Sequence, residues 1–352
     1  DAAIIEALCA DGASLEDARD YAIVGCVEPT PSGNTMGITN ASYFNMAKCL
    51  ELALFDGVCQ KSKVQMGSKN GKAADFTDIS QLIKAYETQI EYFAEMMVIS
   101  LNSIEKIMSE YGQHIYCSML IDGCLESGKD STSGGAKYNY TGVQGVGIVD
   151  VGDSLTAIKT LVFDDKVISM KELLVALNED FKGHEVLQQR LIHKADKYGN
   201  DIKEADEMVA YVARHYCEYF RGKKNFRGGQ FRPGLFCLSS NTPLGRQVCA
   251  TPNGRNSSTP LADGGVSPKH GMDVNGPTVA RLDQSLAVNG TNFNLKFLPS
   301  TLKTIDDRQR LVDLIRSFFS IDAFHIQFNI LRPETLIDAQ KHPENYRSLV
   351  VR

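Results

Sequence analysis

Segments with helical spacing alternate with short, apolar, strand-like segments along the whole chain, and this alternation constrains the fold more than any other feature. The clearest helical segment is residues 77–112, where apolar side chains recur largely at steps of three and four residues. Strand-like runs dominate the final third, at RPGLFCL (232–238), FNLKFL (293–298) and AFHIQFNIL (323–331). Because this alternation is typical of helices packed on a sheet, we expect an α/β fold.

The other expected elements follow from the same periodicities and from Gly, Pro and capping residues. We expect helices at 2–10, from Ser14 through an S-x-x-D cap, and at 41–56, 153–162, 170–181, 184–197, 202–221 and 306–319. We expect a buried strand at YAIVGCV (21–27), a loop at EPTPSGNTMG (28–37), and a tight Gly-rich loop (133–154) that leads into a helix at Asp153. No repeat or low-complexity linker interrupts the pattern, so we expect one unit over 1–352 without an internal boundary.

Composition excludes several classes of protein. With 43% hydrophobic and 23% charged residues, the 352-residue chain is not expected to be disordered. Its net charge of −6 argues against a nucleic-acid partner, and no apolar run reaches the roughly 18 residues that a membrane span needs. The nine cysteines form no C-x-x-C pair and no zinc-type spacing with histidine, and the first twenty residues lack a secretory signal. We therefore expect reduced thiols, no metal site and a cytoplasmic location.

The pentapeptide GCVEP (25–29) is the strongest chemical signal in the chain. Cys26 and Glu28 are two residues apart and would point to the same face of a strand, which Pro29 is expected to end. A strand end that opens into a Gly/Pro loop is where α/β barrels place their chemistry. On these five residues alone, a catalytic thiol and carboxylate are no better an interpretation than a buried Cys beside a chance acid.

Three longer segments decide between these interpretations. YAIVGCVEPTPSGNTMG followed by ASYFNMAKCLELAL resembles the active-site loop of glycyl radical enzymes. QVCATPNGRNSSTPLADGGVSPKHGMDVNGPT resembles their long C-terminal segment, and HIQFNILRPETLIDAQKHPENYRSLVVR resembles the stretch that runs into the glycyl radical loop. The resemblance is to the pyruvate formate-lyase-like superfamily, in the branch that contains glycerol and propanediol dehydratases and choline trimethylamine-lyase. Pyruvate formate-lyase proper has two adjacent cysteines, whereas Gly25 precedes Cys26 here.

The resemblance implies a fold, and it implies that the chain is a fragment of a longer protein. It implies the C-terminal half of a ten-stranded α/β barrel, stopped just short of the loop whose glycine carries the radical. Asp1 leads directly into the expected helix at 2–10, and the chain stops on the strand-like run LVVR (349–352), as a fragment would.

The resemblance also implies a chemistry in which Cys26 carries a thiyl radical and Glu28 acts as a general base. We therefore expect a radical lyase that eliminates water from a small diol, with both side chains at a loop tip inside the barrel and pointing into a common cavity. The alternatives that remain open are a radical C–N or C–S lyase, a decarboxylase, and an inert fragment of such an enzyme.

Two further positions match substrate-binding residues of the family, but neither match is clean. Diol dehydratases have an Asp fourteen residues after the Cys, where this chain has Asn40. Choline trimethylamine-lyase has a Thr thirteen residues after the Cys, and Thr39 matches it, although Met36–Ile38 replace the aromatic residues of that loop. We expect Thr39 and Asn40 to contact the substrate, whose identity stays open.

No bound cofactor is expected. The glycines of GVQGVG (142–147) are spaced G-x-x-G-x-G, which is not the dinucleotide-binding order. The resemblance implies instead a glycyl radical on a residue outside this chain, installed by an activating enzyme that uses S-adenosylmethionine and an iron–sulfur cluster. The expected partners are a small-molecule substrate, this radical-SAM activase and a second copy of the protein in a homodimer.

Overall fold

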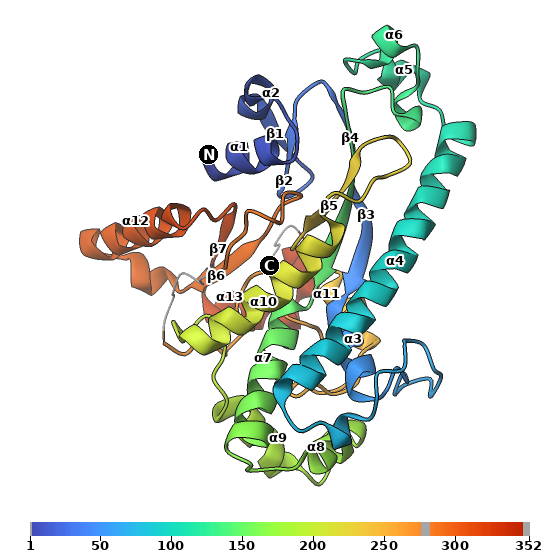
Figure 1. Ribbon diagram of the computed structural model, residues 1–352. Coiled ribbons are helices and arrows are strands. Elements are labelled where there is room, and N and C mark those ends of the chain that lie inside the picture. The colour runs from blue at the N-terminus through green and yellow to red at the C-terminus, as the bar shows by residue number, and fades with distance from the viewer. Residues whose placement is uncertain (1, 276–281, 348–352) are drawn as a thin grey trace.

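Parallel strands form the centre of the computed structural model, which describes residues 2–275 and 282–347 (Figure 1). Strands β3 (Thr35–Asn45), β4 (Tyr138–Val146) and β5 (Gln230–Gly234) form one parallel sheet in that order. Strands β6 (Phe293–Phe297) and β7 (Ile326–Ile330) form a parallel pair, and a bridge between Leu235 and Thr291 connects the two groups. Helices separate the parallel strands along the chain, which confirms the α/β class.

The helices account for most of the predicted helical segments. Their bounds are α1 (Ala2–Ala10), α2 (Leu15–Arg19), α3 (Met46–Leu54), α4 (Ile79–Tyr111), α5 (Ile115–Ser118), α6 (Cys124–Ser127), α7 (Ile148–Ile158), α8 (Met170–Asn178), α9 (Glu185–His193), α10 (Lys203–Phe220), α11 (Asn241–Arg246), α12 (Ile305–Ser320) and α13 (Pro333–Lys341). The long helix α4 begins at Asp78, whose side chain accepts hydrogen bonds from the amides of Ser80 and Gln81, and ends at Gly112. Within the described residues, no helix is long and apolar enough to cross a membrane.

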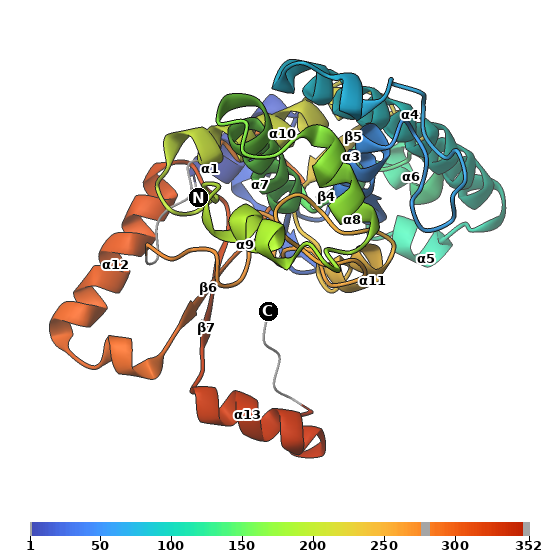
Figure 2. The same ribbon diagram turned by 90° about the horizontal axis from the view of Figure 1, so that it is seen from below.

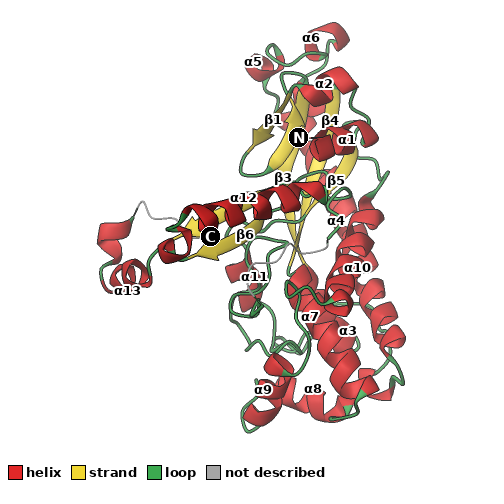
Figure 3. Cartoon of the chain, turned by 90° about the vertical axis from the view of Figure 1, so that its left-hand side faces the viewer, coloured by secondary structure: helices red, strands yellow, loops and turns green. Residues whose placement is uncertain are grey.

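The core lies between the β3-β4-β5 sheet and helices α3, α4, α7 and α10, which pack beside it (Figure 3). Helix α7 is buried along its whole length, as expected of a helix covered on every side. It packs closely on α10 because Gly152 has no side chain, and an added Cβ there would collide with Val209. Helix α13, by contrast, has no buried residue and extends away from the rest of the described chain (Figure 2).

Two predicted elements were wrong because distant contacts override the local pattern. The helix expected at 41–56 is strand β3 up to Asn45, and only Met46–Leu54 is helical. The Gly-rich loop expected at 133–154 contains strand β4, and helix α7 begins directly after Gly147. The glycines of β4 allow close packing instead of forming a loop, since a Cβ at Gly142 would collide with the carbonyl of Thr39 on β3.

The segment around Cys26 also differs from the prediction. Strand β1 (Tyr21–Val24) is mostly exposed rather than buried, and it pairs antiparallel with strand β2 (Glu28–Pro31), which is buried and lies where a loop was expected. Pro29 lies within β2 and does not end a strand; a two-stranded ribbon tolerates it because each strand is an edge. The predicted strand-like run at 349–352 lies outside the described residues.

Candidate active site

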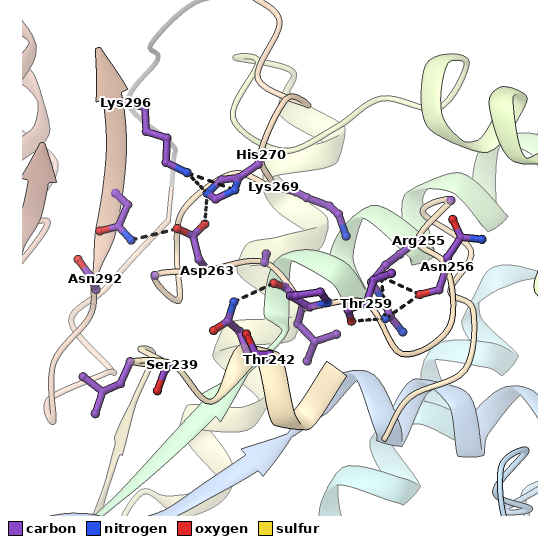
Figure 4. Close-up of a pocket in the computed structure, with 18 of the residues that line it drawn as sticks. Ser239, Thr242, Arg255, Asn256, Thr259, Asp263, Lys269, His270, Asn292 and Lys296 are labelled. Atoms are coloured by element: carbon purple, nitrogen blue, oxygen red, sulfur yellow. Dashed lines mark hydrogen bonds and ion pairs between the residues drawn. The ribbon is translucent and has the colours of Figure 1, made fainter. Parts of the chain in front are cut away.

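A cavity of about 1210 Å³ lies where distant parts of the chain meet. Figure 4 shows its interior. Cys26 lines it, together with residues from α9, from segments 238–242 and 254–270, and from segment 292–296, most of which belongs to β6. Loops at the ends of parallel strands are where α/β barrels hold their reacting groups, so this cavity is the candidate site.

Cys26 lies at the tip of the β1–β2 hairpin. The pairing of Val24 with Glu28 leaves Gly25, Cys26 and Val27 as a three-residue turn. Val27 is buried, and its carbonyl group lies against Gly290, where an added Cβ would collide with it. Val27 therefore anchors the turn against the segment around Gly290, while Cys26 is only partly buried and borders the cavity.

Glu28 follows the turn and is 2% exposed. Its Oε2 atom accepts hydrogen bonds from the backbone N–H of Cys26, at 2.9 Å, and of Val27, at 2.8 Å. The structure thus brings the predicted thiol and carboxylate residues together, but Glu28 is not among the described residues that line the cavity. The expected strand geometry does not apply, because Cys26 lies in the turn and the carboxylate folds back onto the turn's amides.

Thr39 and Asn40 lie where the β3–β4 ladder is irregular, between Ile38 and Ser42. The backbone carbonyl of Thr39 accepts side-chain hydrogen bonds from Gln144 and Asn289, each at 2.7 Å. Asn40 is exposed, and neither residue is among those described as lining the cavity.

Tyr43 interacts with Asn40 and with the charge of Glu28, and no sequence pattern singles it out. Burial raises the pKa of Tyr43, hydrogen bonds from Asn40 and Ser240 partly offset this effect, and the charge of Glu28 raises the pKa further. The Tyr43 hydroxyl is therefore hydrogen-bonded to Asn40 and senses the charge of Glu28.

A second group of titratable side chains borders the cavity and was missed at the sequence level (Figure 4). Asp263 Oδ1 lies 2.6 Å from His270 Nε2, and Lys296 Nζ lies 3.2 Å from His270 Nδ1. Burial raises the pKa of Asp263, but the hydrogen bond and charge of His270 and the charge of Lys296 hold it below its usual value. Asp263 and His270 belong to the PLADGGVSPKHG stretch. Its resemblance to the family does not indicate that these residues lie near Lys296.

The wall formed by 254–270 is anchored to helix α7. Asp150, on α7, is fully buried and accepts hydrogen bonds from the backbone N–H of Ala262, at 2.6 Å, and from Lys269 Nζ, at 2.9 Å. Burial raises the pKa of Asp150, but the charges of Lys269 and Arg255 outweigh it and lower the pKa overall. The cavity wall is therefore attached to the most buried helix of the core. No group of three His, Cys, Asp or Glu that could hold a metal ion occurs in the described part of the chain.

Comparison with known families agrees with this geometry. The family described as "Pyruvate formate lyase-like" matches residues 1–245, and a second family, "Glycine radical", matches residues 262–352. The chain belongs to the pyruvate formate lyase-like family. Our expectation of a single unit that stops before the radical glycine stays a prediction.

Curated relatives of this family member include several dehydratases. It is 38% identical to a probable dehydratase, YbiW, of Escherichia coli, over 97% of this chain and 44% of the relative. It is 35% identical to (2S)-3-sulfopropanediol dehydratase of Klebsiella oxytoca, over 100% of this chain and 44% of the relative. The chain thus spans less than half the length of these relatives.

Solved structures show the same fold. The glycerol-bound, B12-independent glycerol dehydratase of Clostridium butyricum matches with a TM-score of 0.94 and 43% identity, over 100% of this chain and 45% of that one. A protein of 1,2-propanediol dehydration in Roseburia inulinivorans matches with a TM-score of 0.95 and 39% identity, over 100% of this chain and 45% of that one. The expectation of a partial α/β barrel of the glycyl radical enzyme type is confirmed.

Proposed function

We propose that the whole protein is a glycyl radical lyase that eliminates water from a small diol. The observation that carries the proposal is the hairpin turn, in which Cys26 borders the cavity and the Glu28 carboxylate accepts hydrogen bonds from the backbone N–H groups of Cys26 and Val27. The dehydratases among the relatives support elimination of water. Thr39 and Asn40 are proposed to bind the substrate hydroxyl groups.

The chemistry follows from the properties of a thiol and a carboxylate. The glycyl radical supplies the unpaired electron, and a thiol S–H bond is weak enough for Cys26 to pass its hydrogen atom on and become a thiyl radical. Cys26 then takes a hydrogen atom from a substrate C–H bond, and the hydroxyl group on that carbon becomes acidic. Glu28 accepts the hydroxyl proton while the neighbouring C–O bond breaks and the departing oxygen keeps the electron pair. Return of that proton to the departing hydroxide gives water, and return of the Cys26 hydrogen atom gives the product.

A lyase for another leaving group is the second candidate, and Asn40 is the observation that favours it. A neutral amide can bind a hydroxyl group but cannot take up a proton as a carboxylate can. The chain is also 34% identical to the isethionate sulfite-lyase of Oleidesulfovibrio alaskensis, over 100% of this chain and 43% of the relative. Assaying glycerol, 1,2-propanediol, choline and isethionate side by side separates the two candidates, and we expect turnover of a diol.

The proposal includes partners. A radical-SAM activase that uses S-adenosylmethionine and an iron–sulfur cluster would install the radical, on a glycine outside this chain. We further propose that the protein acts as a homodimer in the cytoplasm. The setting is proposed to be anaerobic, because a backbone radical does not survive oxygen.

Two substitutions test the roles of Cys26 and Glu28. In the activated whole protein, Cys26→Ser should abolish turnover and all exchange of substrate hydrogen, because an alcohol O–H bond is too strong to replace the thiol. Glu28→Gln should preserve the first hydrogen transfer but slow elimination by about 10²–10⁴-fold, the usual contribution of a positioned base. The Cys26 thiol exchanges its deuterium with water, so substrate labelled with deuterium and recovered from the Gln variant should still lose its label, which mass spectrometry measures.

The control is the wild-type protein treated identically with the same labelled substrate. Elimination by Glu28→Gln at close to the wild-type rate would contradict the lyase proposal, because Glu28 would then be only a structural carboxylate.

A further inference from the structure

We propose that Glu28 has a second role, in which its carboxylate fixes the backbone conformation of the turn and so directs the Cys26 thiol toward the cavity. The inference rests on the proposed function, since it concerns the thiol that is proposed to carry the radical. In this second role Glu28 is a positioning residue that acts through Cys26, separately from its action as a base.

The first observation is where the amides of the turn find their acceptor. Hairpin pairing ends at Val24 and Glu28, so the N–H groups of Cys26 and Val27 lie beyond the strand ladder. Both donate to the same atom, Glu28 Oε2, at 2.9 and 2.8 Å. Buried backbone N–H groups need a partner, and a carboxylate forms stronger hydrogen bonds with them than a neutral acceptor does.

These two hydrogen bonds restrict the backbone from which the Cys26 side chain projects. They fix the peptide planes on both sides of the Cys26 Cα atom, and these planes set the direction of its Cα–Cβ bond. The carboxylate is itself held in place, because Glu28 is 2% exposed and belongs to β2, all four residues of which are buried. A fixed carboxylate that binds two adjacent amides therefore limits how far the thiol can move.

The second observation is the close approach of Gly25 to the carboxylate. Gly25 has a φ of +64°, which a side chain disfavours. An added Cβ would lie 2.9 Å from Glu28 Oε1 and 3.0 Å from Oε2, closer than a carbon atom can approach these oxygens without displacement. The absence of a side chain at position 25 therefore leaves space for the Glu28 carboxylate. We call the pair of hydrogen bonds from the Cys26 and Val27 amides to Glu28 Oε2 the clamp. Gly25→Ala is expected to disturb the clamp while keeping both the thiol and the carboxylate.

The exchange rates of the Cys26 and Val27 amide hydrogens, measured in the whole protein before activation, report the strength of these hydrogen bonds without any catalytic step. Glu28→Gln keeps an oxygen that can accept from both amides, whereas Glu28→Leu has similar size and no acceptor. We expect the Cys26 and Val27 amides to exchange within about twofold of the wild-type rate in the Gln variant. In the Leu variant they should exchange at least about tenfold faster, the factor that one hydrogen bond of ordinary strength is worth. Equal exchange in the Leu and Gln variants would overturn the inference.

Thiol reactivity provides the second measurement. Both Glu28 variants remove the same negative charge near Cys26, so a difference between them reports position rather than charge. We expect iodoacetamide to modify Cys26 at rates that differ about tenfold between the Leu and Gln variants, with the exposed Cys117 as the internal reference. Identical rates would contradict the clamp. If Glu28→Leu does not fold, Gly25→Ala replaces it and is compared with the wild-type protein, because both keep the Glu28 charge; about tenfold faster amide exchange and an altered rate of Cys26 modification are expected, and unchanged rates of both would contradict the clamp.

The failure of the clamp and the failure of the proposed function can be told apart. If the Leu and Gln variants exchange their amides equally while the wild-type protein turns over its substrate, Glu28 would act only as a base and not as a positioning residue. A wild-type protein that exchanges no substrate hydrogen through Cys26, but whose amides respond to Glu28→Leu as expected, would leave the clamp in place and refute the radical lyase.

Discussion

Asp150 and Asp153 are three residues apart on α7 and both are fully buried, yet their pKa values move in opposite directions. For Asp150, the charges of Lys269 and Arg255 outweigh burial and lower the pKa. For Asp153, burial raises the pKa to about 7, and the charge of Lys197 and the N–H of Tyr198 offset only part of that effect. Two identical side chains on one helix thus differ because Asp150 forms an ion pair with Lys269 of the cavity wall, whereas the nearby charges offset only part of the burial effect for Asp153.

Asp153 should therefore make stability decline as pH rises. Its pKa is about 7 in the folded protein against a usual 3.8, so between about pH 4 and pH 7 the folded state holds a proton that the unfolded state has released. Stability from this group falls with increasing pH across that window. Asp153→Asn removes the titration and keeps an oxygen for the Tyr198 N–H, which Asp153 binds at 2.9 Å.

We expect Asp153→Asn to resemble the wild-type protein near pH 4.5 and to be more stable at pH 8, by about 1.4 kcal/mol for each unit of the pKa shift. Urea unfolding midpoints at several pH values measure this. Parallel pH profiles for the two proteins would show that Asp153 does not titrate in this range.

At the residue scale, sequence reasoning found Cys26 and Glu28 but not how they meet. A spacing of two predicts neighbouring side chains on a strand, and the two residues do meet, but through the backbone of a turn. The interaction depends on the Val24–Glu28 register, which local sequence does not specify. The contact of Asp263 and His270 with Lys296 was out of reach because no periodicity relates residues so far apart along the chain.

At the scale of elements, Arg227 joins β3, β4 and α4. Its guanidinium donates to the carbonyl groups of Met36 on β3 and Tyr140 on β4, each at 2.6 Å. Arg227 Nε also lies 3.2 Å from Glu105 Oε2 on α4, and both side chains are almost fully buried. One cation therefore fixes the edge of the sheet to the long helix.

Breaking this pair should destabilise the protein strongly. Glu105→Leu leaves the buried charge of Arg227 without its anion, and removal of one partner of a buried ion pair costs about 3–5 kcal/mol. We expect a large decrease in the urea midpoint. Lys84→Ala is the matched control, because it breaks an exposed ion pair with Glu87 on the same helix and should leave the midpoint nearly unchanged. Similar midpoints for both variants would contradict this role of Arg227.

The elements that sequence predicted best are those whose signal is local and long. Helix α4 was expected at 77–112 and runs from Ile79 to Tyr111, because its apolar spacing persists for many turns between a cap and a glycine. Only residues 41–45 of β3 fall in the predicted helix; Tyr43 and Phe44 suit either structure, and the pairing of β3 with β4, about a hundred residues away, decides the outcome. The glycines of β4 likewise cannot be interpreted locally, because the close packing that requires them involves residues that are distant in sequence.

At the scale of the whole molecule, the candidate site is assembled from segments that span almost the entire chain. The hairpin turn near the N-terminus and the segments 238–270 and 292–296 border one cavity. The chain matches the complete length of neither the curated relatives nor the solved structures, of which it covers 44–45% in the cases compared. The proposed activity therefore belongs to the whole protein, and its decisive test lies at this scale.

That test is the radical itself. Treated without oxygen with its radical-SAM activase, S-adenosylmethionine and a reductant, the whole protein should show a glycyl doublet in electron paramagnetic resonance, because the remaining α-hydrogen of the radical glycine splits the signal in two. Turnover should appear with the doublet and disappear on exposure to air.

The 352-residue chain alone is the matched control, and we expect it to show neither doublet nor turnover, because it spans only 44% of the length of its dehydratase relatives. Cys26→Ser in the whole protein should keep the doublet and lose turnover, since the thiol acts only after the radical has formed. A wild-type protein that turns over a diol in air without any doublet would exclude the radical mechanism, whatever the geometry of the turn.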